Sequence, residues 1–220
     1  MFQKINMDIS QAIVIDTTKA KWVESKSNKV LRKPLEREKA EAGHVTSIVQ
    51  YLPQSKFDAH THPKGEEIYV IEGIFSDEHG DYPAGSYLRN PPGTSHSPFS
   101  KEGCTILVKL DQFQEGDFKQ IALNTTKQKW LPGHGELKVM PLHSFKTEGT
   151  ALVRWPAGER FLPHSHFGGE EIYVISGVFK DENGEYPKGT WIRSPHLSTH
   201  HPWVDEETII LVKTGHLHKG

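Results

Sequence analysis

The sequence predicts an all-β protein built as two tandem barrels, and three observations support this fold class. Seven residues, Gly-Glu-Glu-Ile-Tyr-Val-Ile, occur at 65–71 and again at 169–175, a shift of 169 − 65 = 104 residues. Apolar and β-branched runs are short and are separated by turn sequences such as Asn-Pro-Pro-Gly. No window of about 12 residues has the 3.6-residue period of an amphipathic helix.

The repeat fixes the number of folding units. Its matches continue beyond the shared heptamer at the same shift, and upstream the segment 17–22 resembles 125–130 at a shift of 125 − 17 = 108. A fixed-period match over most of a chain indicates one unit present twice. We therefore expect two domains, residues 1–115 and 116–220, each close to the usual domain size of about 100–150 residues.

The candidate strands follow in chain order within each unit. They are residues 45–52, 68–71 and 105–110 in the first unit, and 151–155, 172–175 and 208–212 in the second. Many short strands with turn chemistry between them favour an antiparallel sandwich or a small barrel. The run 26–41 is dense in charges of both signs, and we interpret it as a solvated face or loop.

Composition excludes several function classes. The chain has 220 residues, 35% of them hydrophobic, and a formal net charge of −2, which is ordinary for a globular protein. No Lys/Arg stripe favours a nucleic-acid partner, and no apolar run approaches the roughly 20 residues that span a membrane. No secretory signal is evident, so we expect a cytoplasmic location. The single cysteine, Cys104, excludes an intrachain disulfide and is interpreted as a packed strand residue.

A cluster of metal-ligand residue types precedes and follows the first copy of the heptamer. His60 and His62 are two apart, so in an extended strand their rings lie on one face. Glu66 shares a strand face with two aliphatic residues that require burial, and a buried carboxylate is costly unless it is paired or bound to a metal. His96 follows a tight Pro-Pro-Gly turn that can return a strand beside the other three. Three imidazoles and one carboxylate suit first-row divalent metals.

The second copy repeats the same candidate ligands. His164, His166, Glu170 and His200 stand 104 residues after the first set. Duplication explains this similarity without requiring function, but the retained pattern predicts a second metal site.

These residues resemble the two motifs of the cupin superfamily. The first motif, His-x-His-x3-Glu-x6-Gly, occurs once in each half, and the second, Gly-x5-Pro-x-Gly-x2-His, is complete in the first half and lacks one glycine in the second. Their residues are His60, His62, Glu66, Gly73, Gly85, Pro91, Gly93 and His96, then His164, His166, Glu170, Gly177, Gly189, Pro195 and His200. The resemblance implies a bicupin with two jelly-roll barrels (double-stranded β-helices) and metal-ligand roles for the eight His and Glu residues. Leu197 stands where the second motif expects glycine, which puts the turn before His200 in question and makes His201 a competing ligand.

A narrower resemblance covers most of both halves. The segments 65–68, 75–85 and 89–93 are similar to the C-terminal cupin domain of the ChrR anti-sigma factors. That resemblance implies a zinc-binding sensor of the stress-response type. Those regulators also carry an N-terminal helical domain with a His-x3-Cys-x2-Cys zinc cluster. Residues 1–45 do not resemble that domain and Cys104 is the only cysteine, so we do not expect sigma-factor binding.

Three functions remain open at this point. The first is a regulatory metal-binding bicupin, with one divalent ion per barrel, zinc foremost and iron, manganese or nickel as alternatives. The second is a metal-dependent dioxygenase for a small oxygenated or diketone-like substrate, since an open metal site leaves room for substrate. The third is a storage-type bicupin without activity. A homodimer and a small-molecule ligand are the expected partners, and the sequence identifies no catalytic acid or base.

Other repeated polar residues have simpler interpretations. Arg89 and Arg193 are interpreted as members of structural ion pairs. Glu67 and Glu171 oppose the predicted metal face, so we expect a surface or inter-sheet role. His216 and His218 form another His-x-His pair near the C-terminus, which we attribute to chance in a frayed tail.

Overall fold

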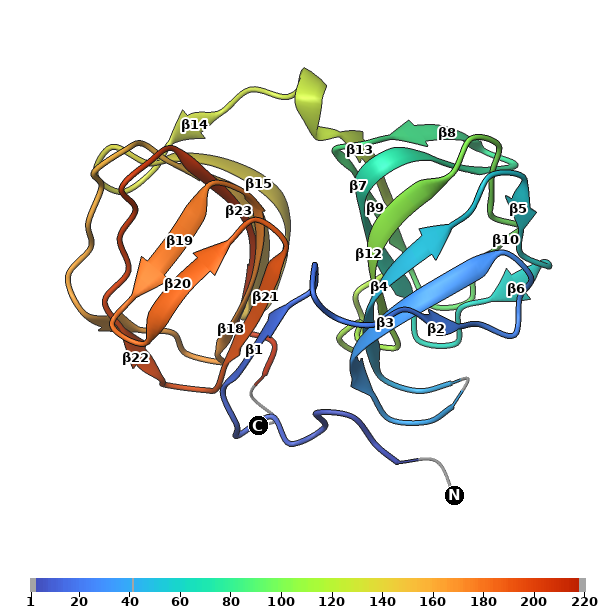
Figure 1. Ribbon diagram of the computed structural model, residues 1–220, viewed down its shortest axis with the longest axis horizontal. Helices are drawn as coiled ribbons and strands as arrows, with labels where there is room; N and C mark the ends of the chain where they lie inside the picture. The colour runs from blue at the N-terminus through green and yellow to red at the C-terminus, as the bar shows by residue number, and fades with distance from the viewer. Residues whose placement is uncertain (1–2, 41, 218–220) are drawn as a thin grey trace. The chain divides into compact units, whose positions relative to one another are not determined.

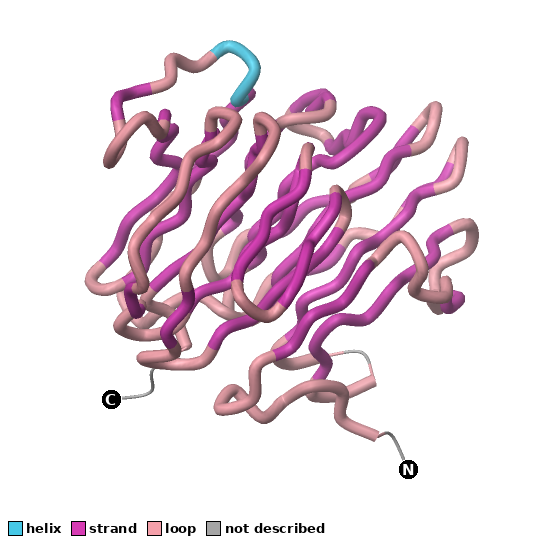
Figure 2. The backbone as a smooth tube through the Cα atoms, turned by 60° about the vertical axis from the view of Figure 1, so that its left-hand side comes forward, coloured by secondary structure: helices cyan, strands magenta, loops and turns pink. Residues whose placement is uncertain are grey.

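The computed structural model describes residues 3–40 and 42–217, and it confirms the all-β prediction with two β-barrels (Figure 1). Within the described residues the single helical element is a 3-10 turn, η1 (Thr125–Lys127), which stands out in cyan in Figure 2. Two compact units form: residues 1–7 with 21–128, and residues 8–20 with 129–220. None of the described helices is long and apolar enough to cross a membrane.

The first barrel has a main antiparallel sheet in the order β13-β9-β7-β12-β4-β3-β2. Short strands complete it: β11 pairs with β5 and β7, β8 pairs with β7, and β10 pairs with β6. The bounds are β2 (Val23–Glu24), β3 (Val30–Arg37), β4 (Val45–Tyr51), β5 (Ser55–Lys56), β6 (His60–Thr61), β7 (Glu66–Asp77), β8 (Gly80–Pro83), β9 (Ser86–Asn90), β10 (Ser95–His96), β11 (Phe99–Ser100), β12 (Cys104–Leu110) and β13 (Ile121–Asn124).

The second barrel repeats this arrangement, with a main sheet in the order β1-β21-β18-β23-β16-β15-β14 and the pairs β17-β22 and β19-β20. The bounds are β1 (Ile13–Asp16), β14 (Leu131–Pro132), β15 (Lys138–Phe145), β16 (Glu148–Trp155), β17 (His164–Ser165), β18 (Glu170–Ser176), β19 (Val178–Asp181), β20 (Gly184–Pro187), β21 (Thr190–Ser194), β22 (Thr199–His200) and β23 (Thr208–Thr214).

The strand register is the same in both barrels. Leu107 of β12 lies opposite Tyr69 of β7, and Leu211 of β23 lies opposite Tyr173 of β18, the same pair moved by 104 residues. Both pairings contain a register shift near the far end, which marks a β-bulge. The sequence repeat is therefore a repeat of hydrogen-bonded pairing as well as of composition.

Each barrel encloses its own apolar core. Alternate residues of β7, Ile68 and Val70, enter the first core with Cys104 of β12, as expected for strands whose successive side chains point to opposite faces. In the second core Trp155 and Val174 pack at 4% and 0% exposure. Cys104 is the packed strand cysteine that the sequence predicts, and burial raises the pKa of its thiol to about 11.

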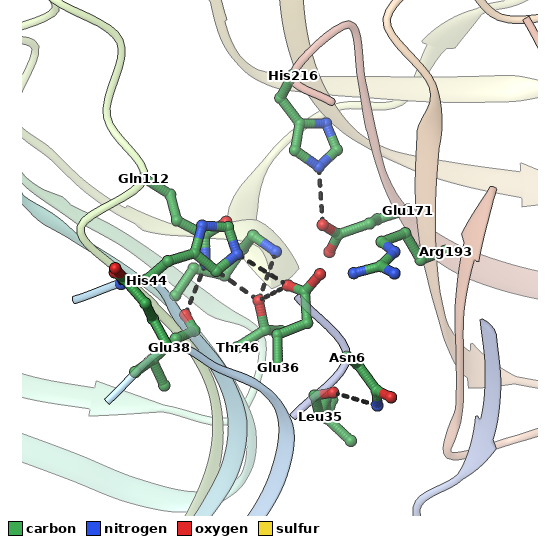
Figure 3. A network of polar contacts seen from close by, with 12 residues as sticks. Asn6, Leu35, Glu36, Glu38, His44, Thr46, Gln112, Glu171, Arg193 and His216 are labelled. Carbon is green, nitrogen blue, oxygen red and sulfur yellow. Dashed lines mark hydrogen bonds and ion pairs between the residues drawn. The ribbon is translucent and has the colours of Figure 1, made fainter. Parts of the chain in front are cut away.

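The charge-rich run corrects one prediction, because much of it is neither solvated nor a loop. Residues 30–37 form β3, and Glu36 within it is fully buried. Its carboxylate accepts a hydrogen bond from Thr46 Oγ1 at 2.6 Å and lies 3.1 Å from His44 Nε2 (Figure 3). A buried carboxylate is tolerated when such partners replace its water. Charge density alone does not predict these partners, since Thr46 lies in the neighbouring strand β4 and His44 lies just before that strand.

The first strand of each sequence repeat joins the barrel formed by the other repeat. β1 pairs with β21 in the second unit, and β13, its repeat equivalent, pairs with β9 in the first (Figure 1). Matched hydrogen bonds fix both strands: Thr17 Oγ1 donates to the Gly189 carbonyl, and Thr125 Oγ1 donates to the Gly85 carbonyl, each at 2.6 Å. The domain limits 1–115 and 116–220 stay a prediction about the repeat, whereas the compact units exchange these two strands.

The repeated arginines anchor the segments that lead into the exchanged strands. Arg89 of β9 forms a buried ion pair with Asp117 at 2.6 Å, ahead of β13, as the structural interpretation predicts. Arg193 of β21 donates instead to the carbonyl oxygens of Asp8 and Gln11, ahead of β1. Both side chains have 0% exposure. A guanidinium carries five donors and suits such a multiple contact.

Candidate metal centres

Short strands bring the histidines of the first barrel together. β6 and β10 pair antiparallel with His60 opposite His96. His62 lies two residues after His60, so its ring points the same way, and the two ring centroids are 5.0 Å apart. The turn before β10 is attached to this segment, because Gly93 N donates to the His62 carbonyl at 2.9 Å. The predicted convergence of two strands on one point is confirmed.

Glu66 completes the first cluster. It opens β7 on the same face as the core residues Ile68 and Val70, as predicted. Its Oε2 atom lies 3.4 Å from His62 Nε2 and 3.3 Å from His96 Nε2. One ligand atom from each of the four predicted residues falls within 4.8 Å of all the others. We call His60, His62, Glu66 and His96 the first centre.

The chemistry of the first centre fits a metal ion. His62 Nε2 and His96 Nε2 are buried and have no hydrogen-bond partner, and each of the two side chains is only 3% exposed. A buried polar atom without a partner costs about 1–3 kcal/mol, so it requires an explanation. A divalent ion bound by three imidazole nitrogens and a carboxylate oxygen would satisfy both atoms, and this donor set suits first-row metals.

Each imidazole of the first centre uses its other nitrogen for a hydrogen bond. Such outer partners fix the ring orientation and leave Nε2 for the ion. The pairs are His60 Nδ1 with the Asp58 carbonyl at 2.9 Å, His62 Nδ1 with Thr94 Oγ1 at 3.3 Å, and His96 Nδ1 with Asp77 Oδ2 at 3.2 Å.

The glutamate of the first centre is held as well. Asn90 Nδ2 donates to Glu66 Oε2 at 3.0 Å. The sequence does not single out Asn90 and Asp77 as supporting residues, since each is the last residue of a strand and looks structural. The available signal was that Asp77 and Asp181 occupy matched positions in the two repeats. Burial lowers the pKa of His62, whereas the pKa of His96 is raised because Asp77 and Glu66 outweigh its burial.

The second barrel brings three histidines together in the same way. β17 and β22 pair with His164 opposite His200. His200 Nε2 lies 3.2 Å from His164 Nε2 and 3.3 Å from His166 Nε2. One ligand atom from each lies within 4.8 Å of the others. This second centre is more open, since the His166 side chain is 24% exposed while the matched His62 is 3% exposed.

Glu170 lies beside the second centre but outside that 4.8 Å group. Its oxygens are 3.4 Å from His166 Nε2 and 3.7 Å from His200 Nε2. Its Oε2 is buried without a hydrogen-bond partner, and burial raises the pKa of the carboxyl to about 8. Ser194 occupies the position of Asn90, because 194 − 90 = 104. The ligand role of Glu170 therefore stays a prediction, with weaker geometry than that of Glu66.

Leu197 does not disturb the turn before His200. It adopts a φ of 60°, close to the 86° of the matched Gly93, and its N–H donates to the His166 carbonyl at 3.1 Å. The turn is thus preserved, but it places a leucine in the left-handed region of backbone conformation, which is unfavourable for residues other than glycine. His200 lies in the cluster, whereas His201 does not, since its ring packs 6.0 Å from that of Trp203.

The other polar candidates lie on the opposite face of the sheets. Glu67 is buried and accepts a hydrogen bond from Tyr87 Oη at 3.1 Å. Glu171 accepts from Trp191 Nε1 at 3.2 Å and lies 2.8 Å from His216 Nε2 (Figure 3). The frayed-tail interpretation is therefore wrong for His216, whose side chain is 6% exposed; the other member of that pair, residue 218, lies outside the described residues.

Fold and sites together define a double-barrel protein with a histidine cluster in each barrel. The family profile described as the ChrR Cupin-like domain matches residues 10–114 and again 119–218. Together these segments cover nearly the whole chain, so the protein belongs to this cupin family, as the motifs predict.

Solved structures share the double-barrel fold at low sequence identity. A protein from Nostoc punctiforme described as a putative dioxygenase has a TM-score of 0.80 and 18% identity, covering 96% of this chain and 85% of its own. YlbA from E. coli has a TM-score of 0.73 and 16% identity, covering 97% and 94%. Bacillus subtilis oxalate decarboxylase, studied for its Mn(II) centres, has a TM-score of 0.62 and 17% identity, covering 94% and 78%. A search of curated proteins found no match.

Proposed function

We propose that this protein is a regulatory bicupin that binds one divalent metal ion in each barrel and senses small molecules through those ions. One observation carries the metal assignment: two buried imidazole nitrogens of the first centre, on His62 and His96, point at the Glu66 carboxylate and lack hydrogen-bond partners. Buried charges and polar atoms arranged in this way are typical of metal sites. Membership of the ChrR Cupin-like family supports the sensor role.

We propose zinc foremost, because the resemblance to the ChrR cupin domain implies zinc, with iron, manganese or nickel as alternatives that the same donor set accepts. His60, His62, Glu66 and His96 would hold the first ion, and His164, His166 and His200, with Glu170 beside them, the second. When bound, such an ion supplies Lewis acidity and a coordination position for an oxygen ligand. The oxalate decarboxylase that shares this fold has Mn(II) centres, which supports manganese as a candidate.

The protein's own residues position the ligands and exclude water. The hydrogen bond from His96 to Asp77 fixes the tautomer that offers Nε2. Asn90 holds one Glu66 oxygen in place. The 3% exposure of His62 and His96 keeps bulk water from the first centre. The first centre is thus built for retention of an ion.

A second candidate function is a metal-dependent dioxygenase for a small oxygenated or diketone-like substrate. The observation that favours it is the second centre, where three histidines form the cluster and Glu170 stands apart. An ion held by three protein ligands keeps positions free for exogenous ligands. The structural similarity to the protein described as a dioxygenase supports this candidate.

Elemental analysis of the purified protein tests the metal assignment. We expect about two ions per chain, falling to about one in His60→Ala/His62→Ala and in His164→Ala/His166→Ala. Fewer than one ion per chain after loading with zinc, iron, manganese and nickel in turn would contradict it. Oxygen uptake by the Fe(II)-loaded protein with a panel of diketones then separates the two functions, since turnover would favour the dioxygenase.

The expected partners also remain proposals. We propose a cytoplasmic homodimer without a sigma-factor partner. Light scattering of the purified protein coupled to size-exclusion chromatography measures the mass, and a value near 24.9 kDa, the mass of one chain, would contradict the dimer.

A further inference from the structure

Three large apolar side chains are exposed on the chain segments that carry the histidines of the second centre. Leu162 is 84% exposed, Phe167 is 58% exposed and Leu197 is 55% exposed. We call these three residues the apolar rim. Isolated exposed apolar residues are common on proteins, but a group of them beside a functional site marks a surface that binds something.

Each residue of the apolar rim is connected directly to a histidine of the centre. The Leu162 carbonyl accepts a hydrogen bond from His164 Nδ1 at 2.9 Å. Phe167 follows His166 in the chain, and Leu197 N donates to the His166 carbonyl at 3.1 Å. The rim is therefore built on the same segments that aim the imidazoles.

The first centre has no such rim at the matched positions. Subtracting 104 from the rim residues gives Asp58, Pro63 and Gly93. One is an acid, one is a small ring and one has no side chain. Since the two barrels share their register and their ligand positions, the apolar rim is required neither by the fold nor by the histidine cluster.

Leu197 gives the strongest sign of a selected surface role. It is held at a φ of 60°, in the left-handed region that leucine disfavours by roughly 1–2 kcal/mol. Its side chain is mostly exposed, so core burial does not offset this strain. Glycine makes the same turn in the first barrel, at Gly93. Strained residues that contribute little to the core concentrate at functional sites.

The openness of the second centre indicates a small molecule as the occupant. His166 is 24% exposed and Glu170 lies outside the group of ligand atoms, so an ion bound by three imidazoles would keep coordination positions for an added ligand. A molecule that reached the ion with a polar head would lay its remaining atoms on the rim. This combination of polar and apolar contacts is typical of ligand sites.

We propose that the second centre binds an amphipathic organic molecule, whose oxygen-donor head coordinates the ion and whose alkyl or aromatic tail packs on Leu162, Phe167 and Leu197. This inference rests on the proposed metal-binding function and names the ligand class of one of its two centres. The first centre, with its acidic and small surroundings, does not select for a tail.

Two hydroxamates with one head and different tails test the proposal. Octanohydroxamate and acetohydroxamate are titrated by calorimetry into zinc-loaded His60→Ala/His62→Ala protein, which retains the second centre alone. Each buried methylene strengthens binding by roughly fourfold, so we expect the octanoyl compound to bind at least tenfold more tightly. The matched control is His164→Ala/His166→Ala protein, in which the first centre should show no tail preference: it binds neither compound, or both with affinities within about threefold of each other.

Exchange of the rim for the matched residues of the first barrel locates the effect. In the single-centre background, Leu162→Asp/Phe167→Pro/Leu197→Gly should keep one zinc ion per chain and lose the preference for the longer tail. The double variant Leu162→Asp/Leu197→Gly avoids a new proline and should reduce the preference as well. A folded triple or double variant that keeps the full preference would overturn the proposal.

The outcomes separate this inference from the proposed function. Absence of zinc from the second centre would remove both. Bound zinc with equal affinity for the two hydroxamates would overturn the ligand class alone. Self-association that the rim substitutions abolish, without any tail preference, would also overturn it, because the occupant of the rim would then be a second copy of the chain.

Discussion

In the first barrel Asn90 donates to Glu66, and that carboxylate stands within the group of possible metal ligands. In the second barrel Ser194 takes the matched position, and Glu170 lies outside the group, with a buried oxygen that has no hydrogen-bond partner. The serine side chain is shorter than that of asparagine, so it does not reach the glutamate as Asn90 does. The residue paired with the glutamate thus differs between a cluster of four possible metal ligands and a cluster of three histidines on the same scaffold.

The difference shows that the two copies keep the candidate ligand residues but differ in a residue that hydrogen-bonds to one of them. All six histidines keep both their positions and their convergence. The changes fall on the residue paired with the glutamate and on exposed residues of the segments that carry the histidines. A duplicated metal protein can therefore acquire two kinds of centre without changing a single ligand residue type.

The largest expected effect comes from removing each glutamate in turn. Glu66→Ala should weaken metal binding at the first centre by more than about 100-fold, because a ligand is lost rather than an outer partner. Glu170→Ala should weaken the second centre by about tenfold or less. Competition with a metal-binding dye, in proteins that retain one centre, measures both. Equal losses would show that the two glutamates act alike.

The two centres should also respond differently to pH. The Glu170 carboxyl has a pKa of about 8 without metal, so below that pH an ion must displace its proton. Affinity at the second centre should therefore rise with pH up to about pH 8, by about tenfold or less in total, the same limit as the loss in Glu170→Ala. His166, whose pKa is lowered to about 4, adds no competing proton in this range. Glu170→Gln should flatten the profile, and an unchanged slope would contradict this account.

The same carboxyl sets a pH trend in the stability of the metal-free protein. Its pKa in the folded state is raised from 4.5 to about 8, so the folded protein binds more protons than the unfolded chain between these values. Stability therefore falls as the pH rises from about 4.5 to about 8. Glu170→Gln, which cannot ionise, is the matched control for unfolding measurements.

Exchanging the residues opposite the glutamates should move each centre toward the other. Asn90→Ser removes the donor to Glu66 and should weaken the first centre by about tenfold, within the range of outer-partner losses. Ser194→Asn offers Glu170 a donor and should strengthen the second centre by a few-fold. Metal competition measures both changes. If Asn90→Ser leaves affinity unchanged, the difference between the centres lies elsewhere.

The smallest expected effect concerns the turn before the distal histidine. Leu197→Gly relieves left-handed strain but adds freedom to the unfolded chain, so stability should rise by only about 0.5 kcal/mol. Gly93→Leu should lower it by about 1 kcal/mol, since a Cβ at Gly93 meets nothing within 4 Å and only its φ of 86° is unfavourable. Urea unfolding of the metal-loaded proteins measures the difference. A larger loss in Leu197→Gly would mean that the leucine packs on the fold.

Strand periodicity carried the prediction of the first centre. The two-residue spacing of His60 and His62 fixed their common face, and the aliphatic partners of Glu66 fixed its direction. The same parity applies to Glu170, so parity could not reveal that this carboxylate stands slightly apart. The residues paired with the two glutamates are Asn90 on β9 and Ser194 on β21, and no local pattern in the sequence shows that they lie beside a glutamate.

Long-range partners account for the other failures. Glu36 is buried because Thr46 and His44 provide hydrogen bonds, a fact that the local charge density obscures. The His216 side chain is buried because its ring packs beside Glu171, which lies 2.8 Å from its Nε2 atom. The sequence repeat also does not predict the exchange of β1 and β13. A repeat shows which segments are equivalent, but the sheet that a strand joins depends on its pairing with strands far away in the chain.

Because of that exchange, the chain cannot be divided between the two repeats without removing an edge strand from each barrel. A gene divided after codon 115 would encode one fragment that keeps β1 but lacks its own β13, and another with the opposite defect. Each fragment would hold the edge strand that its counterpart needs. We therefore expect the two fragments to fold only when they are produced together, because each barrel takes one edge strand from the other fragment.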